Sequence, residues 1–243
     1  MSSGSLIGRS VVVVGASAGI GEAAARAFGA AEADVVIVGR SKERLDAAAE
    51  RIGFPVRAAT LDATDGGAVA EFFAALGPVD HLVLAASPGA AGSGPIAAVD
   101  EAALRQAFDG KFFAYFSVLK AASVRDSVTL ITAASARAAY PGAAGLAAVN
   151  GALEAMVPAL AVELAPLRIN AVSPGVIDTQ WWDGLGEQRE GFLQSVASVS
   201  PVRRVGRPED VADAVVYLAG AGFVTGTVLE VTGGANLTVG AAS

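Results

Sequence analysis

The chain contains no cysteine and only one histidine, His81, among its 243 residues. Without cysteine it can form no disulfide, no thiolate metal site and no cysteine nucleophile. A single histidine excludes metal sites built from several imidazoles and leaves a serine–histidine–aspartate triad with one candidate base. We therefore expect no bound metal and no thiol chemistry.

Positive charge is also scarce, since 17 Lys and Arg face 24 Asp and Glu for a formal net charge of -7. A nucleic-acid partner would need clustered positive charge, so we expect none. Charged residues make up 17% of the chain and hydrophobic residues 53%. This excess of apolar surface favours a packed globular protein over a disordered one.

The chain also lacks a long uninterrupted hydrophobic run. The longest apolar stretch, Gly142–Leu167, is broken by Asn150, Glu154 and Glu163, whereas a membrane span needs about 20 nearly uncharged residues. The segment Met1–Arg9 shows no basic region followed by an apolar one. We expect no membrane contact and a cytoplasmic protein.

What is present is a regular alternation of short strand patterns with helical ones. The predicted strands are Val11–Val14, Val35–Val38, Val56–Leu61, His81–Ala85, Val128–Thr132, Arg168–Val172 and Val228–Val231. The predicted helices are Glu22–Ala31, Arg40–Ile52, Ala68–Leu76, Glu101–Ala122, Ala143–Leu164 and Pro208–Ala219. Such an order predicts an α/β fold: a single-domain, Rossmann-type, doubly wound parallel sheet of about seven strands, spanning residues 1–243.

Three glycines follow the first predicted strand and open the first helix. Their spacing is G-x-x-x-G-x-G at Gly15, Gly19 and Gly21. Glycines let the backbone turn tightly and approach a pyrophosphate, whose charge the helix N-terminus favours. A glycine triplet in an alanine- and glycine-rich chain also arises from packing alone, but its place between a strand and a helix indicates a phosphate site.

Further motifs occur in a fixed order after this loop. They are Asp62 after the third strand, the segment Asn170–Gly175, Thr179, the segment Gly206–Val211, and the pairs Thr225-Gly226 and Gly233-Gly234. Together with the glycine loop, in which Val14 stands where Thr is usual, they resemble the short-chain dehydrogenases/reductases from Val11 to Leu237. The resemblance implies an oxidoreductase with a nicotinamide dinucleotide.

The resemblance also implies which residues hold that cofactor. They are Gly15, Ser17, Ala18, Gly19, Ile20, Gly21, Arg40, Ser41, Asp62, Ala63, Ala85, Ala86, Pro174, Gly175, Val176 and Thr179. An acidic residue at the end of the second strand selects NAD, but this position is Gly39, followed by Arg40. An adjacent guanidinium suits the 2′-phosphate of NADP(H), so we expect NADP(H) rather than NAD(H). In the alternative, these are solvated helix charges, with Arg44 paired to Glu43 or Asp46.

The resemblance implies a catalytic Tyr, a Lys four residues later, a Ser and an Asn. An alignment without gaps places Leu146 at the Tyr, Asn150 at the Lys, Ala133 at the Ser and Lys111 at the Asn. No Tyr-x-x-x-Lys occurs anywhere in the chain. We therefore expect non-standard or weak activity.

Lys111 and Thr132 are the candidate catalytic residues that remain. Burial in an apolar pocket lowers the pKa of a lysine and makes it a usable acid, and Thr132 and Ser135 lie near the expected mouth. The alternatives are that Lys111 extends to solvent along a helix and that the hydroxyls bond to the backbone at a strand end.

A long irregular segment, 178–201, contains Trp181 and Trp182. The resemblance implies a lid over a small apolar substrate, and the alternative is an ordinary core or a subunit contact. The predicted helix Ala143–Leu164 is apolar nearly all round, which calls for cover on more than one side. The resemblance implies a homodimer or a homotetramer.

Two functions compete at this point. The first is an oxidoreductase with a non-standard proton source, or one that acts on an activated alkene or an imine. The second is an inactive dinucleotide-binding or interaction protein on the same scaffold. A lyase or epimerase that shares the fold is a third.

Overall fold

The computed structural model describes residues 5–238. Two predictions fall partly outside the described residues. They concern residues 1–4 of the segment Met1–Arg9 and residues 239–243 of the predicted domain. The predicted fold class is confirmed: seven parallel strands form one sheet in the order β3-β2-β1-β4-β5-β6-β7. The strands are β1 Ser10–Val14, β2 Asp34–Gly39, β3 Val56–Thr60, β4 Val79–Leu84, β5 Val124–Ile131, β6 Arg168–Pro174 and β7 Val228–Val231.

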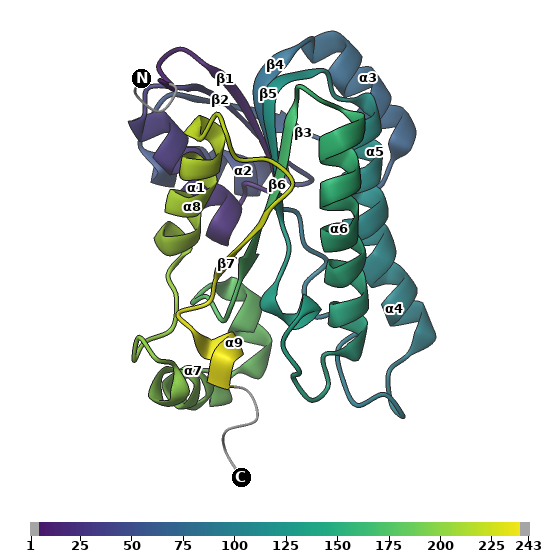
Figure 1. Cartoon of the computed structure of the whole chain (residues 1–243), viewed down its shortest axis with the longest axis vertical. Coiled ribbons are helices and arrows are strands. Elements are labelled where there is room, and N and C mark those ends of the chain that lie inside the picture. Colours follow the sequence, from purple (N-terminus) through teal and green to yellow (C-terminus); the bar gives the residue numbers. More distant parts are fainter. Residues whose placement is uncertain (1–4, 239–243) are drawn as a thin grey trace.

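Helices cover both faces of this sheet, as Figure 1 shows with the sheet between two helical layers. The α-helices are α1 Gly19–Ala30, α2 Lys42–Ile52, α3 Gly66–Leu76, α4 Glu101–Ala107, α5 Ala114–Ala121, α6 Ala144–Glu163, α7 Gln188–Val199, α8 Pro208–Gly220 and α9 Ala235–Thr238. Three short helices are η1 Phe108–Phe113, of π type, and the 3₁₀ turns η2 Ala134–Ala136 and η3 Gln180–Leu185.

The β-branched strands form because both of their faces are buried. In β1, Val11 and Val13 belong to the core beneath α1, α2 and α8, whereas Val12 and Val14 belong to the core beneath α3, α5 and α6. A continuous apolar run rather than an alternating one is typical of such a doubly covered parallel strand. The strand order reverses between β1 and β4, and in such sheets ligands bind beyond the carboxyl ends of the strands at that point.

The prediction of one continuous helix over Glu101–Ala122 is wrong in its middle. The helix contains the π turn η1, where backbone hydrogen bonding widens to i→i+5. Gly110 allows this turn to approach the loop after β4, because a Cβ at Gly110 would lie 2.9 Å from Cβ of Pro88. The turn directs Lys111 inward, where the lysine is buried.

The expected irregular segment 178–201 is also more ordered than its composition indicates. It forms the 3₁₀ turn η3 and the three-turn helix α7. Thr179 caps the N-terminus of η3, since its hydroxyl accepts a hydrogen bond from the backbone N–H of Trp181 at 3.3 Å. In Figure 1, α7 lies near α9, at the end of the molecule toward which β7 runs.

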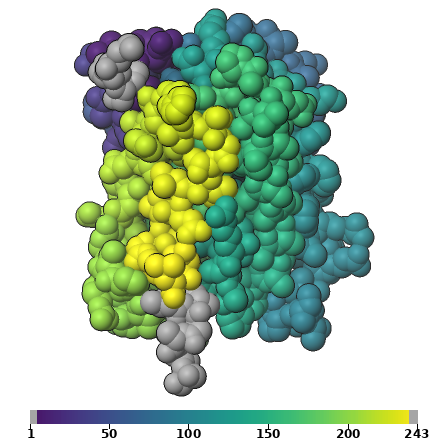
Figure 2. Space-filling model, viewed as in Figure 1, coloured from purple at the N-terminus to yellow at the C-terminus, as the bar shows by residue number. Residues whose placement is uncertain are grey.

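Helix α6 is long and apolar enough to cross a membrane by length and composition, and it is the one such helix in residues 5–238. It nevertheless packs on the sheet: Leu153, Val157 and Ala161 are buried in the core to which β5 and β6 contribute. Its apolar character therefore follows from its place as a core helix. Figure 2 shows the segment around β7 crossing the front of the molecule between α8 and α6.

Candidate active site

The glycine loop is built so that side chains at two of its glycines would collide with backbone. Gly15 has a φ of +89°, and a Cβ there would lie 2.4 Å from the backbone N of Ala86. A Cβ at Gly21 would lie 2.2 Å from the carbonyl oxygen of Gly15. The loop thus folds tightly on itself and against the segment after β4. It leaves the backbone within reach of a ligand, as a phosphate cradle requires.

The N-terminus of α1 lacks the side-chain cap that several other helices have. Its N-cap residue is Ala18, in an extended conformation and without a capping side chain. By contrast, α2, α3 and α4 begin at Ser41, Asp65 and Asp100, whose side chains accept backbone N–H groups. The first N–H groups of α1 therefore remain for an anion. This geometry fits the pyrophosphate of a dinucleotide.

Other predicted cofactor residues lie at the same end of the sheet as this loop. Thr179 lies beside Gly19, with its methyl carbon 3.4 Å from where a Cβ of Gly19 would be. The backbone N–H of Ala85 donates to Val14, and that of Gly175 donates to Val231. The loops after β1, β4 and β6 thereby meet at one edge of the sheet. Ser17 and Ile20 belong to the glycine loop and the first turn of α1, and Ala63, Pro174 and Val176 follow or end strands at the same edge.

Arg40 and Asp62 lie at the far end of this edge, after β2 and β3. The carboxylate of Asp62 accepts hydrogen bonds from the backbone N–H and hydroxyl of Thr64, at 3.0 and 2.8 Å. These bonds, with a smaller contribution from the nearby Arg40 guanidinium, hold the pKa of Asp62 below its ordinary value. Arg40 is exposed. Gly39 of β2 pairs with Thr60 of β3, so Arg40 and Asp62 follow neighbouring strands at the same end of the sheet.

The alternative in which Arg44 pairs with a neighbouring carboxylate is not what the structure shows. Asp46 instead pairs with Lys42 at 2.7 Å. Glu43 accepts a hydrogen bond from the hydroxyl of Ser41 at 2.8 Å. Within the described chain, neither Arg40 nor Arg44 takes part in an ion pair.

Lys111 is buried, with 8% of its surface exposed, and does not extend to solvent. Its ammonium group donates to Oδ1 of Asn150 at 2.8 Å and to the carbonyl oxygen of Thr132 at 3.4 Å. Burial lowers the pKa of Lys111 to about 8, and the negative charge of Glu154 partly opposes this shift. An amine with such a pKa exchanges its proton near neutral pH.

Asn150 is held from several sides. Its amide group donates to the carbonyl oxygen of Leu146 at 2.8 Å, one helical turn earlier, and to the hydroxyl of Ser135 at 3.5 Å. With its NH₂ group turned that way, the amide oxygen faces Lys111. Leu146 is half-buried, and Ala133 sits in extended backbone just before η2.

Thr132 is buried directly after β5, and its hydroxyl is already engaged. It donates to Oε1 of Glu154 at 2.8 Å and lies 3.2 Å from the carbonyl oxygen of Val172. The expected alternative, a strand-end hydroxyl bonded to backbone, describes part of this geometry. A catalytic role for Thr132 stays a prediction.

Three polar residues beside the candidate site, Tyr115, Arg137 and Glu154, are not among the site residues predicted from the sequence. Tyr115 is buried one turn after Lys111, and its hydroxyl lies 3.1 and 3.2 Å from the carbonyl oxygens of Ala86 and Ile131. Buried Glu154 forms an ion pair with the partly exposed Arg137, with Oε2 of Glu154 2.8 Å from Nε of Arg137. Asn150 and Glu154, four residues apart in an otherwise apolar helix, were the available signal, because that spacing puts both on one face.

The tryptophans form an aromatic cluster that borders the same end of the sheet. The ring centroids of Trp181 and Trp182 lie 4.3 Å apart, and the ring centroid of Phe192 in α7 lies 4.7 Å from that of Trp182. The indole N–H of Trp182 donates to the carbonyl oxygen of Ile177 at 2.9 Å. This bond fastens the cluster to the segment that follows β6.

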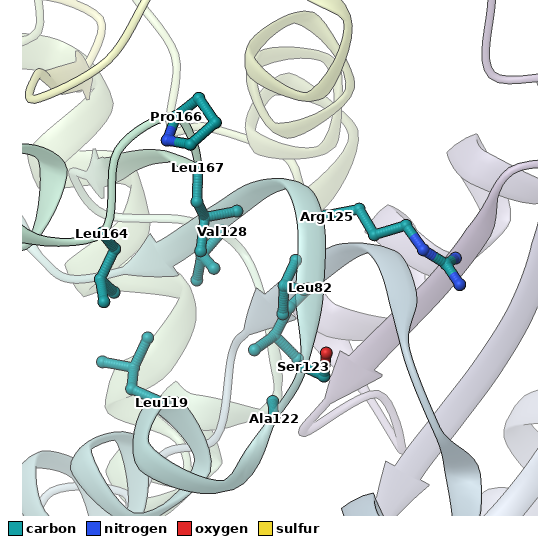
Figure 3. A pocket seen from close by; sticks show the side chains of 10 residues that line it. Leu82, Leu119, Ala122, Ser123, Arg125, Val128, Leu164, Pro166 and Leu167 are labelled. Carbon is teal, nitrogen blue, oxygen red and sulfur yellow. The ribbon is translucent and has the colours of Figure 1, made fainter.

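A hollow of about 330 Å³ lies elsewhere, at the amino end of β5 (Figure 3). Its walls come mainly from the ends of α5 and α6 and the turn before β6. Arg125 at its rim is bonded to Asp80 at 3.4 Å. None of the predicted site residues lines it.

Comparison with known proteins decides the family. Residues 15–236 match the family described as Enoyl-(Acyl carrier protein) reductase. The short-chain dehydrogenase/reductase ATR9 of Stachybotrys chlorohalonatus is 31% identical, over 95% of this chain and 98% of that relative. The chain belongs to the short-chain dehydrogenase/reductase family. It is thus an oxidoreductase of this type, and the family implies a nicotinamide dinucleotide cofactor.

Other short-chain dehydrogenases/reductases are similar over nearly the whole chain. Galactitol 2-dehydrogenase (L-tagatose-forming) of Cereibacter sphaeroides is 32% identical, over 94% of this chain and 95% of that protein. Among solved structures, the MalC Reductase/Diels-Alderase from Malbranchea aurantiaca has a TM-score of 0.87 at 28% identity, covering 96% of this chain and 97% of that one. Members with these different names share the fold, so the substrate must be argued from the site.

Proposed function

We propose that this protein is an NADP(H)-dependent oxidoreductase in which the ammonium group of Lys111 supplies the proton that a tyrosine supplies elsewhere in the family. The acceptor is an activated alkene or an imine in a small apolar substrate. The contact between Nζ of Lys111 and Oδ1 of Asn150 carries this proposal, because it fixes a buried ammonium group beside the edge where the cofactor loops meet.

The preference for NADP(H) rests on the end of β2. Gly39 offers no carboxylate to repel a 2′-phosphate, and Arg40 is exposed and has no ion-pair partner in the described chain. A guanidinium binds phosphate through paired hydrogen bonds. Asp62, kept ionised by Thr64 and Arg40, is the candidate partner of the adenine amino group.

The choice of acceptor follows from the residue at the tyrosine position. Leu146 has no proton to give, so an alkoxide forming on a simple ketone would lack a close donor. Hydride addition to a conjugated alkene spreads the charge over an enolate, and an imine nitrogen takes up a proton readily. Both reactions therefore depend less on a proton donor placed beside one particular oxygen atom.

Lys111 has the groups that such a reaction needs. An ammonium has three N–H donors, and two of them point to Asn150 and Thr132. The third has no acceptor in the described chain and is available to a substrate. The bound dinucleotide would supply the hydride, and Lys111 the proton, which the neutral amine then regains from water.

Titration with NADPH and NADH, followed by a substrate panel, tests this function. We expect NADPH to bind more tightly, and Arg40→Asp to reverse that preference. Enones and imines should be reduced faster than simple ketones. NADPH binding without oxidation across the panel would instead indicate an inactive dinucleotide-binding protein, and binding of neither nucleotide would overturn the proposal.

We also propose that the protein acts in the cytoplasm as a homodimer or homotetramer, with residues 178–201 as the substrate lid. The exposed side of α6 supports assembly: it presents small apolar residues and Val162, which is 80% exposed. Light scattering that gives the mass of one chain would contradict the oligomer.

A further inference from the structure

A row of polar residues lies beneath α6 where three neighbouring strands end. Ile131 of β5 pairs with Val172 of β6, so Thr132 and Ser173, the next residues, are neighbours. Ser173 in turn pairs with Glu230 of β7. Thr132 and Ser173 are both almost fully buried. A polar group in a core position is costly unless a hydrogen bond satisfies it. The Ser173 hydroxyl has no hydrogen-bond partner among the described residues, whereas the Thr132 hydroxyl has one, and that partner indicates why Thr132 is there.

Helix α6 closes over this row with Glu154, whose surface is 8% exposed. One carboxylate oxygen accepts the Thr132 hydroxyl at 2.8 Å, and the other accepts Nε of Arg137 at 2.8 Å. Arg137 extends from η2 toward β7, where its guanidinium lies 3.4 Å from Glu230. Both oxygens of Glu154 are thus held, and the carboxylate has a fixed position.

Thr132 connects this carboxylate to the ammonium group. Its carbonyl oxygen lies 3.4 Å from Nζ of Lys111, while its hydroxyl lies 2.8 Å from Glu154. One residue therefore contacts both charges. A buried ammonium group is stable only if an opposite charge or several acceptors offset the lost hydration.

We propose that Glu154 is the counter-ion of Lys111, fixed by Thr132 and Arg137, and that it acts through Thr132, without an ion pair of its own to the ammonium group, to set the charge state of Lys111. Its effect on catalysis rests on the proposed function of Lys111, whereas the coupling of the two charges does not. Glu154 is a positioning residue, because it acts through Lys111.

Three groups from the elements around Lys111 bear on this balance. Helix α6 contributes Glu154, which favours the charged amine, and the loop after β5 contributes Arg137, which competes for the same carboxylate. Tyr115, in α5 directly after η1, is neutral because burial raises its pKa far above the ordinary value. Removal of Glu154 therefore lowers the pKa of Lys111, and removal of Arg137 raises it.

The chain offers a direct measurement, since it has only three lysines: Lys42, Lys111 and Lys120. Protein labelled with ¹³C at lysine Cε gives three signals, and Lys111→Met identifies the buried one. Each signal shifts as its amine titrates, and the midpoint of that pH titration reports the pKa of the lysine. We expect Glu154→Gln to lower the Lys111 midpoint by on the order of one pH unit. Glu163→Gln, the same change at an exposed position of α6, should leave the midpoint unchanged. An unchanged midpoint in folded Glu154→Gln overturns the proposal.

A second variant covers the case in which Glu154→Gln does not fold. Arg137→Gln removes the competing guanidinium and should move the Lys111 midpoint upward, and a midpoint that stays in place or falls contradicts the counter-ion. Glu154→Asp, which keeps the charge, should restore most of the wild-type midpoint.

Kinetics separate this inference from the proposed function. If Glu154→Gln shifts both the Lys111 midpoint and the high-pH limb of the pH–rate profile, the counter-ion role of Glu154 and the proton-donor role of Lys111 are both supported. If the midpoint moves but the pH–rate profile does not, the counter-ion stands and Lys111 is not the proton donor. If the profile moves without the midpoint, the counter-ion proposal is wrong.

Discussion

The side chains of Lys111 and Asn150 meet at 2.8 Å, ammonium to amide oxygen, across the space between η1 and α6. In the pattern that the sequence resembles, these two positions hold an asparagine and a lysine, respectively. The same two kinds of group thus face each other with their places exchanged. The exchange keeps one positive charge at the site but attaches it to a π turn, whose backbone is held by the close approach of Gly110 to Pro88.

Replacement of Lys111 by methionine tests the assigned proton donor. Methionine fills a similar volume without the ammonium group, so we expect turnover to fall about 10²-fold or more. The affinity for NADPH should change much less, because Lys111 lies outside the glycine loop and the α1 N-terminus, where we propose that the phosphates bind. Stopped-flow absorbance at the nicotinamide band and fluorescence titration measure the two effects. Equal losses in both would point to a role in cofactor binding instead.

The rate of reduction should fall as pH rises through about 8, the pKa of Lys111. The reaction needs the protonated amine, which is present below that pKa and lost above it. A pH–rate profile under single-turnover conditions shows this limb. In Lys111→Met the limb should be missing, and a limb that persists there belongs to another group.

Gly21→Ala should abolish dinucleotide binding. The added Cβ would lie 2.2 Å from the carbonyl oxygen of Gly15, so the loop must open. Gly191→Ala is the matched control, since that glycine lies within α7 and a Cβ there meets nothing within 4 Å. Calorimetry with NADPH compares the two. Normal binding by folded Gly21→Ala would show that the loop is not the phosphate site.

The sheet was predictable from the sequence because each strand has a recognisable pattern within a few consecutive residues. Val11–Val14 is buried on both faces, and such a run of β-branched residues has few other uses. The glycine loop was predictable for the same reason: steric demands at Gly15 and Gly21 act over a few residues.

The arrangement around Lys111 was not predictable in this way. A π turn depends on Gly110 meeting Pro88, a contact between residues that are 22 positions apart. Glu154 acquires its role only when α6 lies over Thr132 and Arg137 folds back from η2. These are tertiary contacts, and a pattern read along one helix does not contain them. Helix α7 in segment 178–201 was not predictable either, because it is weakly amphipathic and shows no clear helical pattern in the sequence.

Stability should decline in mild acid because of His81. Its ring is buried and bonded to the hydroxyl of Ser127 at 2.8 Å, and burial lowers its pKa below the ordinary 6.5. As pH falls below 6.5, the unfolded chain takes up a proton that the folded chain refuses, so the free energy of unfolding falls. The slope cannot exceed about 1.4 kcal/mol per pH unit for one group. Urea unfolding at pH 7.5 and 5.5 should show a smaller difference in His81→Asn than in the wild type.

The two tryptophans should report closure of the predicted lid, because they are the only tryptophans in the chain. Trp182 is fixed through its N–H to Ile177, whereas no hydrogen bond is found for the indole of Trp181 among the described residues. We therefore expect Trp181→Phe to lose most of the fluorescence change that NADPH and substrate cause. Trp182→Phe should keep that change but lower the melting temperature, since it breaks the bond to Ile177.

A kinetic measurement tests whether Trp181 contacts the substrate. If Trp181→Leu raises KM and leaves kcat unchanged, Trp181 contacts substrate in the ground state. Unchanged KM and an unchanged signal would place residues 178–201 outside the substrate path.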